Sequence, residues 1–576
     1  MPAAQSERKN TAHCLSRVEG RIERQQGVLF ISELNREGSS KMGTAGWDFK
    51  SGALRIAPAI CLAATVVVAR AQAPRPAPEH IYHNPILFAD YSDPDVIRDG
   101  ADYYLIASTF HFVPGIPILQ SNDLVHWTIL GHAVARLDMD PRYSMIGGNR
   151  YGKGVWAPSL RKHDGLFYVY FPTPIEGIFV TTAANITGPW SEPTAVIAQA
   201  GLEDPCPFWD DDGSAWLIHS VTGAGPLILH RMSPDGKHVL DDGKVIVQDP
   251  EHLPVLEGPK LYKRNGYYYI FAPIGGVSGG SQAVLRSRQI YGPYEHRIVL
   301  AQGSTKINGP HQGAYVETPD GQGWFVHFQS DGAHGRIVHL EPVRWQDDWP
   351  VIGADPDDAP TGQPVPSGPI PEHDGAASRQ RPQTSDEFNE ATLAPQWEWN
   401  HNPDDSHWSL SARPGFLRLT PMQADGDGLL SARNTLTQCM QDNAFEFTVR
   451  LDLAGMKTGV HTGLAMFEKA ASGLEVVQTG TLRQLNFFHL PDHIAGPEVK
   501  QNTLQLRVRV DGDQARYFYS LDDGKTFRPL GTLTPIHFSW WKGSRPSLFA
   551  YTTQASDPGV IDFDWAHYQA EGANPW

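Results

Sequence analysis

The chain has 576 residues, 47 Lys and Arg against 64 Asp and Glu, a formal net charge of −17 and four cysteines. This length exceeds what one hydrophobic core usually holds, so we expect at least two domains. The acidic balance excludes nucleic acid as a partner, because such a surface repels phosphate backbones. So few cysteines exclude a disulfide-stapled scaffold.

The N-terminal 71 residues are predicted to be a leader. Basic residues precede an apolar run over 56–69, which ends in small-residue cleavage sites of the Ala-x-Ala type. This order is typical of a secretory signal peptide, and the run is too short to be a comfortable membrane span. We predict an over-extended gene start at 1–41 and a signal peptide at 42–71. The mature protein would begin near Gln72, be secreted or periplasmic, and have no membrane attachment after signal removal.

Five short stretches between residues 98 and 328 share a polar-Asp/Asn-Gly turn followed by an aromatic-aliphatic strand. They are RDGADYYLIAS, KHDGLFYVYFP, DDDGSAWLIHS, KRNGYYYIFAP and TPDGQGWFVHF, with their glycines 48 to 65 residues apart. Asp-Gly or Asn-Gly between two β-type runs indicates a hairpin, because Gly accepts the positive φ of the tight turn. Five repeated hairpins at this spacing predict a five-bladed β-propeller over residues 80–350.

One residue shortly before each turn occupies an equivalent place: Asp93, Trp156, Asp204, Glu257 and His311. If the strand before each turn is the innermost of its blade, all five point toward the propeller axis. Three carboxylates in one pocket are costly unless they have a chemical role. Two carboxyl groups across a sugar ring suffice for glycoside hydrolysis, and a third can keep the acid protonated. The Trp could stack on a sugar and the His could hydrogen-bond the pocket or hold a water or ion, although either could be structural.

The motifs SDPDVIRDG, GVWAPSL, EDPCPFWDDDG, LEGPKLYKRNG and GAYVETPDG occur in this order within residues 84–345. In sequence and order they resemble glycoside hydrolase family 43, the five-bladed β-xylosidases and α-L-arabinofuranosidases. The resemblance implies that Asp93 is the general base, Asp204 the pKa modulator and Glu257 the general acid of an inverting enzyme. It also implies that Arg336, in HGRIVHLEPVRW, binds substrate.

The stretch STFHFVPGIPILQSNDLVHW is similar to the exo-acting branch of the family, whose loops admit only a terminal sugar. Phe112 is a candidate for the closed wall of the pocket, with core packing as the alternative. The implied substrates are β-1,4-xylo-oligosaccharides or arabinoxylan fragments, and no cofactor is required. The rival interpretation is a non-catalytic carbohydrate-binding propeller.

Residues 351–383 are rich in Pro, Gly and Asp without periodicity, which predicts a linker. Short alternating strands such as FEFTVRLDL and LQLRVRV follow within 384–573 and predict a β-sandwich. This part resembles the concanavalin-like jelly roll that follows the propeller in many xylosidases of the family. The expected fold class is therefore all-β.

Two roles are open to the second domain. It could only stabilise the propeller, or its segment HFSWWKGSRPSLFAY could project Trp540 or Trp541 toward the sugar pocket. Asp386, Asp562 and Asp564 could hold a structural Ca²⁺, since hard cations favour oxygen ligands, but no regular metal-loop spacing supports this.

Overall fold

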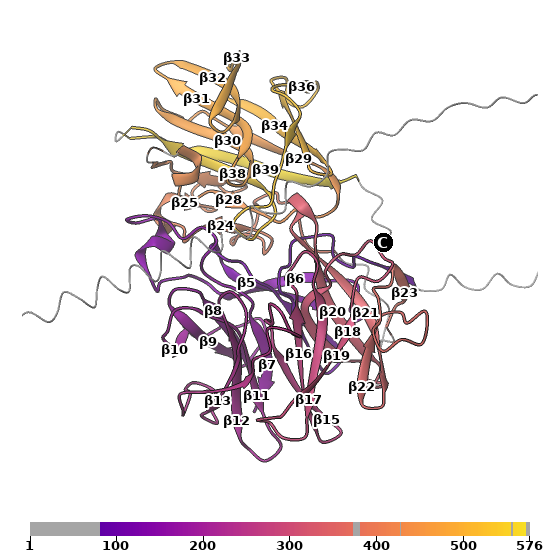
Figure 1. Cartoon of the computed structure of the whole chain (residues 1–576). Helices are drawn as coiled ribbons and strands as arrows, with labels where there is room; N and C mark the ends of the chain where they lie inside the picture. Colours follow the sequence, from indigo (N-terminus) through magenta and orange to yellow (C-terminus); the bar gives the residue numbers. More distant parts are fainter. Residues whose placement is uncertain (1–80, 372–380, 425, 427, 555–556, 572–576) are drawn as a thin grey trace, which may run out of the picture. The chain divides into compact units, whose positions relative to one another are not determined.

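The computed structural model describes residues 81–371, 381–424, 426, 428–554 and 557–571. The predicted leader and the middle of the predicted linker lie outside these residues. Regular structure in the described chain is almost entirely β, which confirms the all-β prediction (Figure 1). Its helical segments are 3-10 turns of three or four residues, too short to cross a membrane. They are η1 (Pro141–Ser144), η2 (Gly332–His334), η3 (Asp405–His407) and η4 (Gly428–Ser431).

Five antiparallel four-stranded sheets form the blades of the predicted propeller. Blade one contains β2 (Asp95–Asp99), β3 (Asp102–Ile106), β5 (Gly115–Ser121) and β6 (Thr128–Val134). Blade two contains β7 (Ser159–His163), β8 (Leu166–Thr173), β9 (Gly177–Ala183) and β10 (Thr194–Ile197). Blade three contains β11 (Leu202–Trp209), β12 (Ala215–Val221), β13 (Leu227–Met232) and β14 (Lys244–Val247). Blade four contains β15 (Lys260–Arg264), β16 (Tyr267–Ile274), β17 (Ser281–Ser287) and β18 (Glu295–Leu300). Blade five contains β19 (His311–Glu317), β20 (Gly323–Ser330), β21 (Arg336–Gln346) and β22 (Trp349–Ile352).

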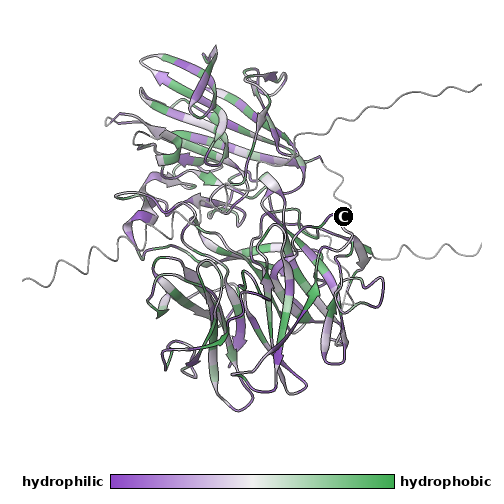
Figure 2. Ribbon diagram, viewed as in Figure 1, coloured by the Kyte–Doolittle hydropathy of each residue, from purple (hydrophilic) through white to green (hydrophobic). Residues whose placement is uncertain are grey.

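The five predicted turns join the first and second strands of successive blades. Their glycines have left-handed φ values between 65° and 86°, which an L side chain adopts only with strain. The first strands also neighbour one another, since β2 contacts β7 and β19, and β11 contacts β7 and β15. They therefore form the inner ring, as the sequence pattern required. Apolar side chains pack between the blades, and Figure 2 shows hydrophobic stretches along the blade strands.

The second domain is a β-sandwich with a single large apolar core between two sheets. The nine-stranded sheet has the order β33-β32-β31-β30-β38-β28-β24-β4, with β27 paired to β38. Its strands are β33 (Asp492–Glu498), β32 (Leu482–His489), β31 (Ser472–Thr479), β30 (Val460–Phe467), β38 (Arg545–Thr552), β28 (Leu436–Thr437), β24 (Glu398–Asn400), β4 (Phe112–Val113) and β27 (Met422–Gln423).

The eight-stranded sheet has the order β25-β26-β39-β29-β34-β35-β36, with β37 paired to β35. Its strands are β25 (Trp408–Ser409), β26 (Leu417–Leu419), β39 (Ile561–Ala570), β29 (Ala444–Asp452), β34 (Thr503–Asp511), β35 (Gln514–Ser520), β36 (Arg528–Pro529) and β37 (Thr534–Pro535).

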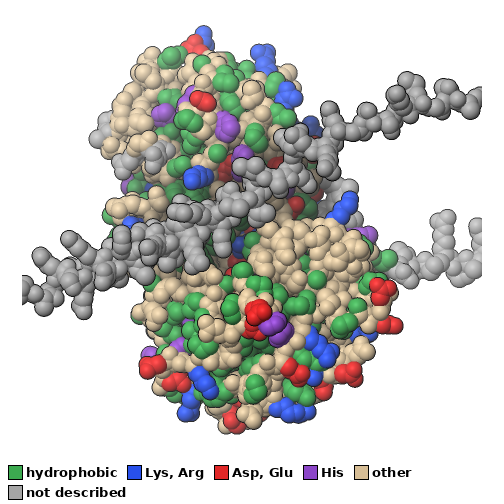
Figure 3. Space-filling model, in the orientation of Figure 1, with side chains coloured by type: hydrophobic (Ala, Val, Ile, Leu, Met, Phe, Trp, Pro, Cys, Tyr) green, Lys and Arg blue, Asp and Glu red, His purple; other side chains and the backbone are tan. Residues whose placement is uncertain are grey.

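Strand β4 belongs to the propeller in sequence but to the sandwich in its pairing. It leaves blade one between β3 and β5, and Phe112 pairs with Asn400 while Val113 pairs with Trp399. The described ends of the linker run along the propeller, where β23 (Ser367–Pro369) pairs with β1 (Ile81–His83). On the face seen in Figure 3, acidic and basic side chains are interspersed.

Candidate active site

The inner ends of the blades carry residues in unusual backbone conformations. Asp93, Asp204 and Gln312 have φ values of 54°, 56° and 36°, in or near the left-handed region. The pairing register also shifts between Glu203 and Cys206 in β11. Non-glycine residues adopt this conformation at a cost, and such residues concentrate at functional sites. The distortion turns side chains out of the regular strand alternation, and it brings the Gln312 side chain against Asp204.

Asp93 is held by two propeller residues from different blades. Its carboxylate accepts hydrogen bonds from the Ser108 hydroxyl at 2.6 Å and from Arg336 Nη1 at 2.9 and 3.1 Å. Asp93 and Arg336 are both 5% exposed. A buried ion pair of this kind fixes the carboxylate orientation, because the guanidinium offers donors in a rigid plane.

Asp204 is also buried and accepts three hydrogen bonds. Oδ2 accepts from the Ser220 hydroxyl and from the backbone N–H of Gly258, each at 2.8 Å, and Oδ1 accepts from Gln312 Nε2 at 3.1 Å. Burial raises the pKa of Asp204 to about 6, with a further increase from the neighbouring Glu257 charge, against the effect of the hydrogen bonds. Asp204 therefore changes charge in a mildly acidic range rather than near pH 4.

Glu257 is the most accessible of the three predicted acids, with 20% of its side chain exposed. Its Oε1 lies 3.0 Å from His311 Nε2. The imidazole nitrogen is not aligned for a hydrogen bond, so this contact is a close polar approach of a buried ring to a reachable carboxyl group. A proton donor to a leaving group needs such access, whereas Asp93 and Asp204 are enclosed.

The Gly-Pro corner after Glu257 has a steric explanation. Gly258 has a φ of 59°, and a Cβ at this position would lie 2.9 Å from the Gln312 side chain and 3.0 Å from Pro273. Its backbone N–H donates to Asp204. Glycine is therefore required for the chain to approach the buried acid this closely, and the corner fixes Glu257 beside Asp204.

A fourth acid, Glu203, joins the cluster and was not predicted from the sequence. One carboxylate oxygen each from Glu203, Asp204 and Glu257 lies within 4.8 Å of the others. Burial, followed by the charges of these two neighbours, raises the pKa of Glu203 well above its usual value. Within the described chain, these three carboxylates are close enough together to hold a cation. Protonation of one of the carboxylates would also relieve their mutual repulsion.

Two tryptophans, one from each domain, meet next to Arg336, the partner of Asp93. Trp156 is half-buried, donates its indole N–H to the Gly152 carbonyl at 3.0 Å, and meets Trp541 edge to face at 6.0 Å between ring centroids. The Arg336 guanidinium lies 5.8 Å from the Trp541 ring centroid. Arg336 thus connects Asp93 with an aromatic side chain of the sandwich.

The structure places the remaining predicted residues elsewhere. Phe112 is 2% exposed and lies in β4 against Arg545, whose guanidinium is 4.1 Å from its ring centroid. This favours the packing alternative over a sugar contact. Asp386, Asp562 and Asp564 do not form a shared cation site, because each has separate partners. Asp562 pairs with Arg413 and Arg418, Asp564 with Arg450, and Asp386 accepts from Trp397 Nε1.

Acid–base cleavage of a glycosidic bond is the chemistry that an enclosed carboxylate and an accessible carboxyl group at one propeller opening can perform. The fold and the site therefore define the class of glycoside hydrolases. Residues 82–350 match the model of glycosyl hydrolases family 43, and residues 385–569 match the beta-xylosidase C-terminal concanavalin A-like domain. The chain belongs to family 43.

Relatives span both domains. A Xylanibacter ruminicola protein is 43% identical, with 82% of this chain and 87% of the relative covered. A beta-xylosidase of Formosa agariphila is 36% identical, with 85% and 90% covered. The non-reducing end alpha-L-arabinofuranosidase BoGH43B of Bacteroides ovatus is 34% identical over 59% of this chain and 64% of its own. The crystal structure of the GH43 protein BlXynB from Bacillus licheniformis has a TM-score of 0.74 at 28% identity, covering 85% of this chain and all of that one.

Proposed function

We propose that this family 43 exo-glycosidase is a secreted, inverting enzyme that removes terminal β-1,4-xylosyl residues from xylo-oligosaccharides. The observation that carries the proposal is the difference in environment between Asp93 and Glu257. Asp93 is enclosed and ion-paired with Arg336, whereas Glu257 is accessible beside His311. The named β-xylosidase relative supports xylose as the sugar.

In the proposed reaction, Asp93 accepts a proton from a water molecule as the water oxygen bonds to the anomeric carbon. Glu257 donates its proton to the glycosidic oxygen as the bond from that oxygen to the anomeric carbon breaks. Attack from the face opposite to the leaving group inverts the configuration, and it requires room for the water between base and acid. Asp204 contacts no reacting atom in this scheme and favours the protonated form of Glu257 by its charge.

In this proposal Trp156 and Trp541 form one wall of the sugar pocket, so that it admits a chain end. Trp156 and Trp541 stand edge to face, and Arg336 lies between Trp541 and the base. A sugar ring can present its C–H face to an indole, while the guanidinium donates to hydroxyl groups. These residues therefore would bind the terminal sugar, and His311 would orient Glu257 from the axis.

Hydrolysis of α-L-arabinofuranosyl residues is the second candidate activity. The arabinofuranosidase relative from Bacteroides ovatus supports it. Steady-state kinetics on p-nitrophenyl β-D-xylopyranoside and p-nitrophenyl α-L-arabinofuranoside, with one enzyme preparation, compares the two. We expect the larger kcat/KM for the xyloside. A larger value for the arabinofuranoside would reverse the assignment.

Inversion is tested separately by proton NMR of p-nitrophenyl β-D-xylopyranoside hydrolysis at early time, in which xylose comes only from the cleaved glycosyl unit. We expect the α-anomer of xylose to appear first and the β-anomer to grow by mutarotation. Initial release of the β-anomer would instead indicate retention, and the proposed roles of Asp93 and Glu257 would be wrong.

A further inference from the structure

The sandwich segment that meets Arg336 forms a turn of unusual composition. Ser539 and Lys542 exchange backbone hydrogen bonds of 2.9 Å in both directions, and the two residues between them, Trp540 and Trp541, have φ values of 53° and 69°. Two consecutive left-handed residues define the type I′ hairpin turn, which normally contains Asn-Gly. Bulky side chains are unfavourable there, so contacts outside the turn must hold it.

Both tryptophans of this turn contact the propeller. Trp540 stacks on Tyr151 with ring centroids 4.0 Å apart and an angle of 15° between the planes. Trp541 faces Trp156 and Arg336 at the candidate active site. The turn is therefore fastened on one side and presents a side chain to the sugar pocket on the other.

Lys542, the last residue of the turn, carries a buried positive charge into the propeller. It is 3% exposed, and its Nζ donates to the backbone carbonyls of Asp90 at 2.9 Å and Ser108 at 3.2 Å. The same nitrogen lies 3.2 Å from Asp90 Oδ2. Burial of a lysine is rare unless it is paired, and here the polar partners of Nζ, Asp90 and Ser108, lie in the other domain.

Asp90 joins this lysine to several backbone groups. Its carboxylate accepts from the N–H of Arg336 at 3.0 Å, the N–H of Gly543 at 2.8 Å and the Ser92 hydroxyl at 3.0 Å. Asp90 is 4% exposed, so its contacts are shielded from water. The Lys542–Asp90 pair is thus the centre of a buried polar network rather than a surface ion pair.

The two side chains that hold Asp93 are both attached to this network. The Ser108 hydroxyl and the Arg336 guanidinium bond the Asp93 carboxylate. Lys542 holds the backbone of Ser108, and Asp90 holds the backbone of Arg336. A displacement of Lys542 would therefore reach the Asp93 carboxylate through two independent routes.

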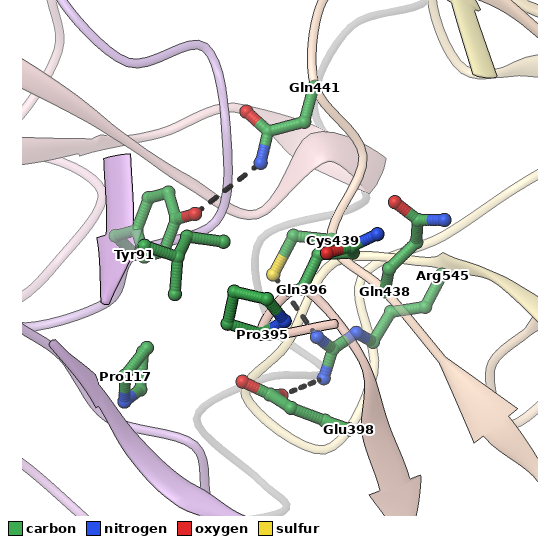
Figure 4. A pocket seen from close by; sticks show the side chains of 10 residues that line it. Tyr91, Pro117, Pro395, Gln396, Glu398, Gln438, Cys439, Gln441 and Arg545 are labelled. Carbon is green, nitrogen blue, oxygen red and sulfur yellow. Dashed lines mark hydrogen bonds and ion pairs between the residues drawn. The ribbon is translucent and has the colours of Figure 1, made fainter. Parts of the chain in front are cut away.

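The sandwich side of the network is also packed. Next to it is the small cavity of Figure 4, where Arg545 donates to Glu398 at 2.7 Å and approaches Cys439 Sγ at 3.2 Å. The Cys439 thiol in turn lies 3.7 Å from the Asp90 carbonyl. The sandwich residues close to Lys542 are therefore fixed by contacts of their own, and Lys542 can hold the propeller backbone in place.

We propose that Lys542 is a positioning residue for the catalytic base, by which the sandwich sets the orientation of Asp93 through Asp90, Ser108 and Arg336. This inference rests on the proposed role of Asp93. Lys542 is buried, and its Nζ bonds Asp90 and the Ser108 backbone rather than the Asp93 carboxylate. Its effect on kcat is therefore confined to steps in which Asp93 takes part, whereas any effect of a displaced Arg336 on sugar binding falls on KM.

The test compares Lys542→Met in the wild-type and Asp93→Ala backgrounds. In Asp93→Ala, sodium azide replaces both water and base, forming a C–N bond as the glycosidic C–O bond breaks. We expect Lys542→Met to lower kcat for p-nitrophenyl xyloside by about 10- to 100-fold in the wild type, since a small misplacement of a reacting group has effects of that size. In Asp93→Ala with azide, the same substitution should change kcat at saturating substrate by less than about twofold. If azide does not increase the rate of Asp93→Ala, the residual hydrolysis rates of Asp93→Ala with and without Lys542→Met are compared instead.

Two controls separate positioning from general destabilisation. Asn402→Ala removes a buried contact between the domains, in which Asn402 Nδ2 donates to the Leu137 carbonyl at 2.7 Å and Oδ1 accepts from its N–H at 2.9 Å. It should lower the Tm without lowering kcat. Lys542→Arg keeps the charge and the donors and should recover most of the rate. If Lys542→Met fails to fold, the double variant that combines Lys542→Met with Asp90→Asn is measured in both backgrounds, because it leaves no unpaired buried charge.

An equal fractional loss of rate in both backgrounds, or an unchanged kcat in Lys542→Met, would overturn the inference and leave the role of Asp93 intact. Nearly wild-type hydrolysis by Asp93→Ala without azide would instead refute the proposed base itself.

Discussion

Replacement of Asp204 by Asn should stabilise the protein near pH 7 while impairing catalysis. The pKa of Asp204 rises from 3.8 to about 6. At about 1.36 kcal/mol per pKa unit, the ionised side chain therefore destabilises the folded state by about 3 kcal/mol relative to the protonated one. Because the folded pKa is the higher one, the side chain favours folding below about pH 4. This contribution is lost as the pH rises through 6.

An asparagine removes the buried charge and can retain the hydrogen bonds. Its oxygen can accept from Ser220 and Gly258, and its NH₂ can donate to Gln312 once that amide flips. Imperfect geometry costs about 1 kcal/mol for such a bond. The net gain in unfolding free energy at pH 7 should therefore be about 1–3 kcal/mol, with none at pH 4.

Urea unfolding of wild type and Asp204→Asn at pH 4 and pH 7 measures this difference. Asp210→Asn is a control with the opposite sign. Burial of Asp210 opposes its charge, but hydrogen bonds from Lys263 and Tyr268 outweigh burial and lower its pKa. Its contribution is present above its unfolded pKa and is lost in acid, so Asp210→Asn should destabilise at pH 7. A stability difference for Asp204→Asn that does not change with pH would refute the argument.

Three further predictions concern the acid, the aromatic wall and the leader. Glu257→Ala should lower kcat/KM for xylobiose by about 10²- to 10⁴-fold and far less for an aryl xyloside whose leaving group needs no proton. Equal losses on both substrates together with a lower Tm would contradict an acid role. Trp541→Ala should raise KM for the aryl xyloside by about 3- to 10-fold, because an aromatic contact contributes about 0.5–1.5 kcal/mol. An unchanged KM would place the sugar elsewhere. N-terminal sequencing of the exported enzyme should begin near Gln72, and Met1 in the mature protein would contradict the predicted cleavage.

The local pattern was sufficient to predict the propeller and its three acids. Each Asp/Asn-Gly turn determines its own hairpin through the backbone freedom of glycine, and the repeat places the preceding residue at an equivalent point of each blade. Strands that contact one another within a blade are then close together in the sequence. This is why the sequence alone groups Asp93, Asp204 and Glu257.

Glu203 and Phe112 could not be predicted in the same way. Regular alternation would turn Glu203 away from its neighbour Asp204, and only the left-handed φ of Asp204 brings both carboxyl groups together. Phe112 was a candidate for the pocket wall because its segment is similar to the exo-acting branch of the family, with core packing as the alternative. Its pairing partner Asn400 is 288 residues away and belongs to another domain, a contact that no local pattern contains.

The pairing of β4 with β24 has a consequence for protein engineering. The family models separate at residues 350 and 385, which suggests that the catalytic part could be produced alone. A chain ending after the propeller would leave Phe112 and Val113 without the strand they pair with, and Asp90 without Lys542. Homologous recombination between such enzymes should therefore exchange both domains together. We therefore expect the two domains to be inherited together, and selection to remove recombinants whose crossover lies within the linker.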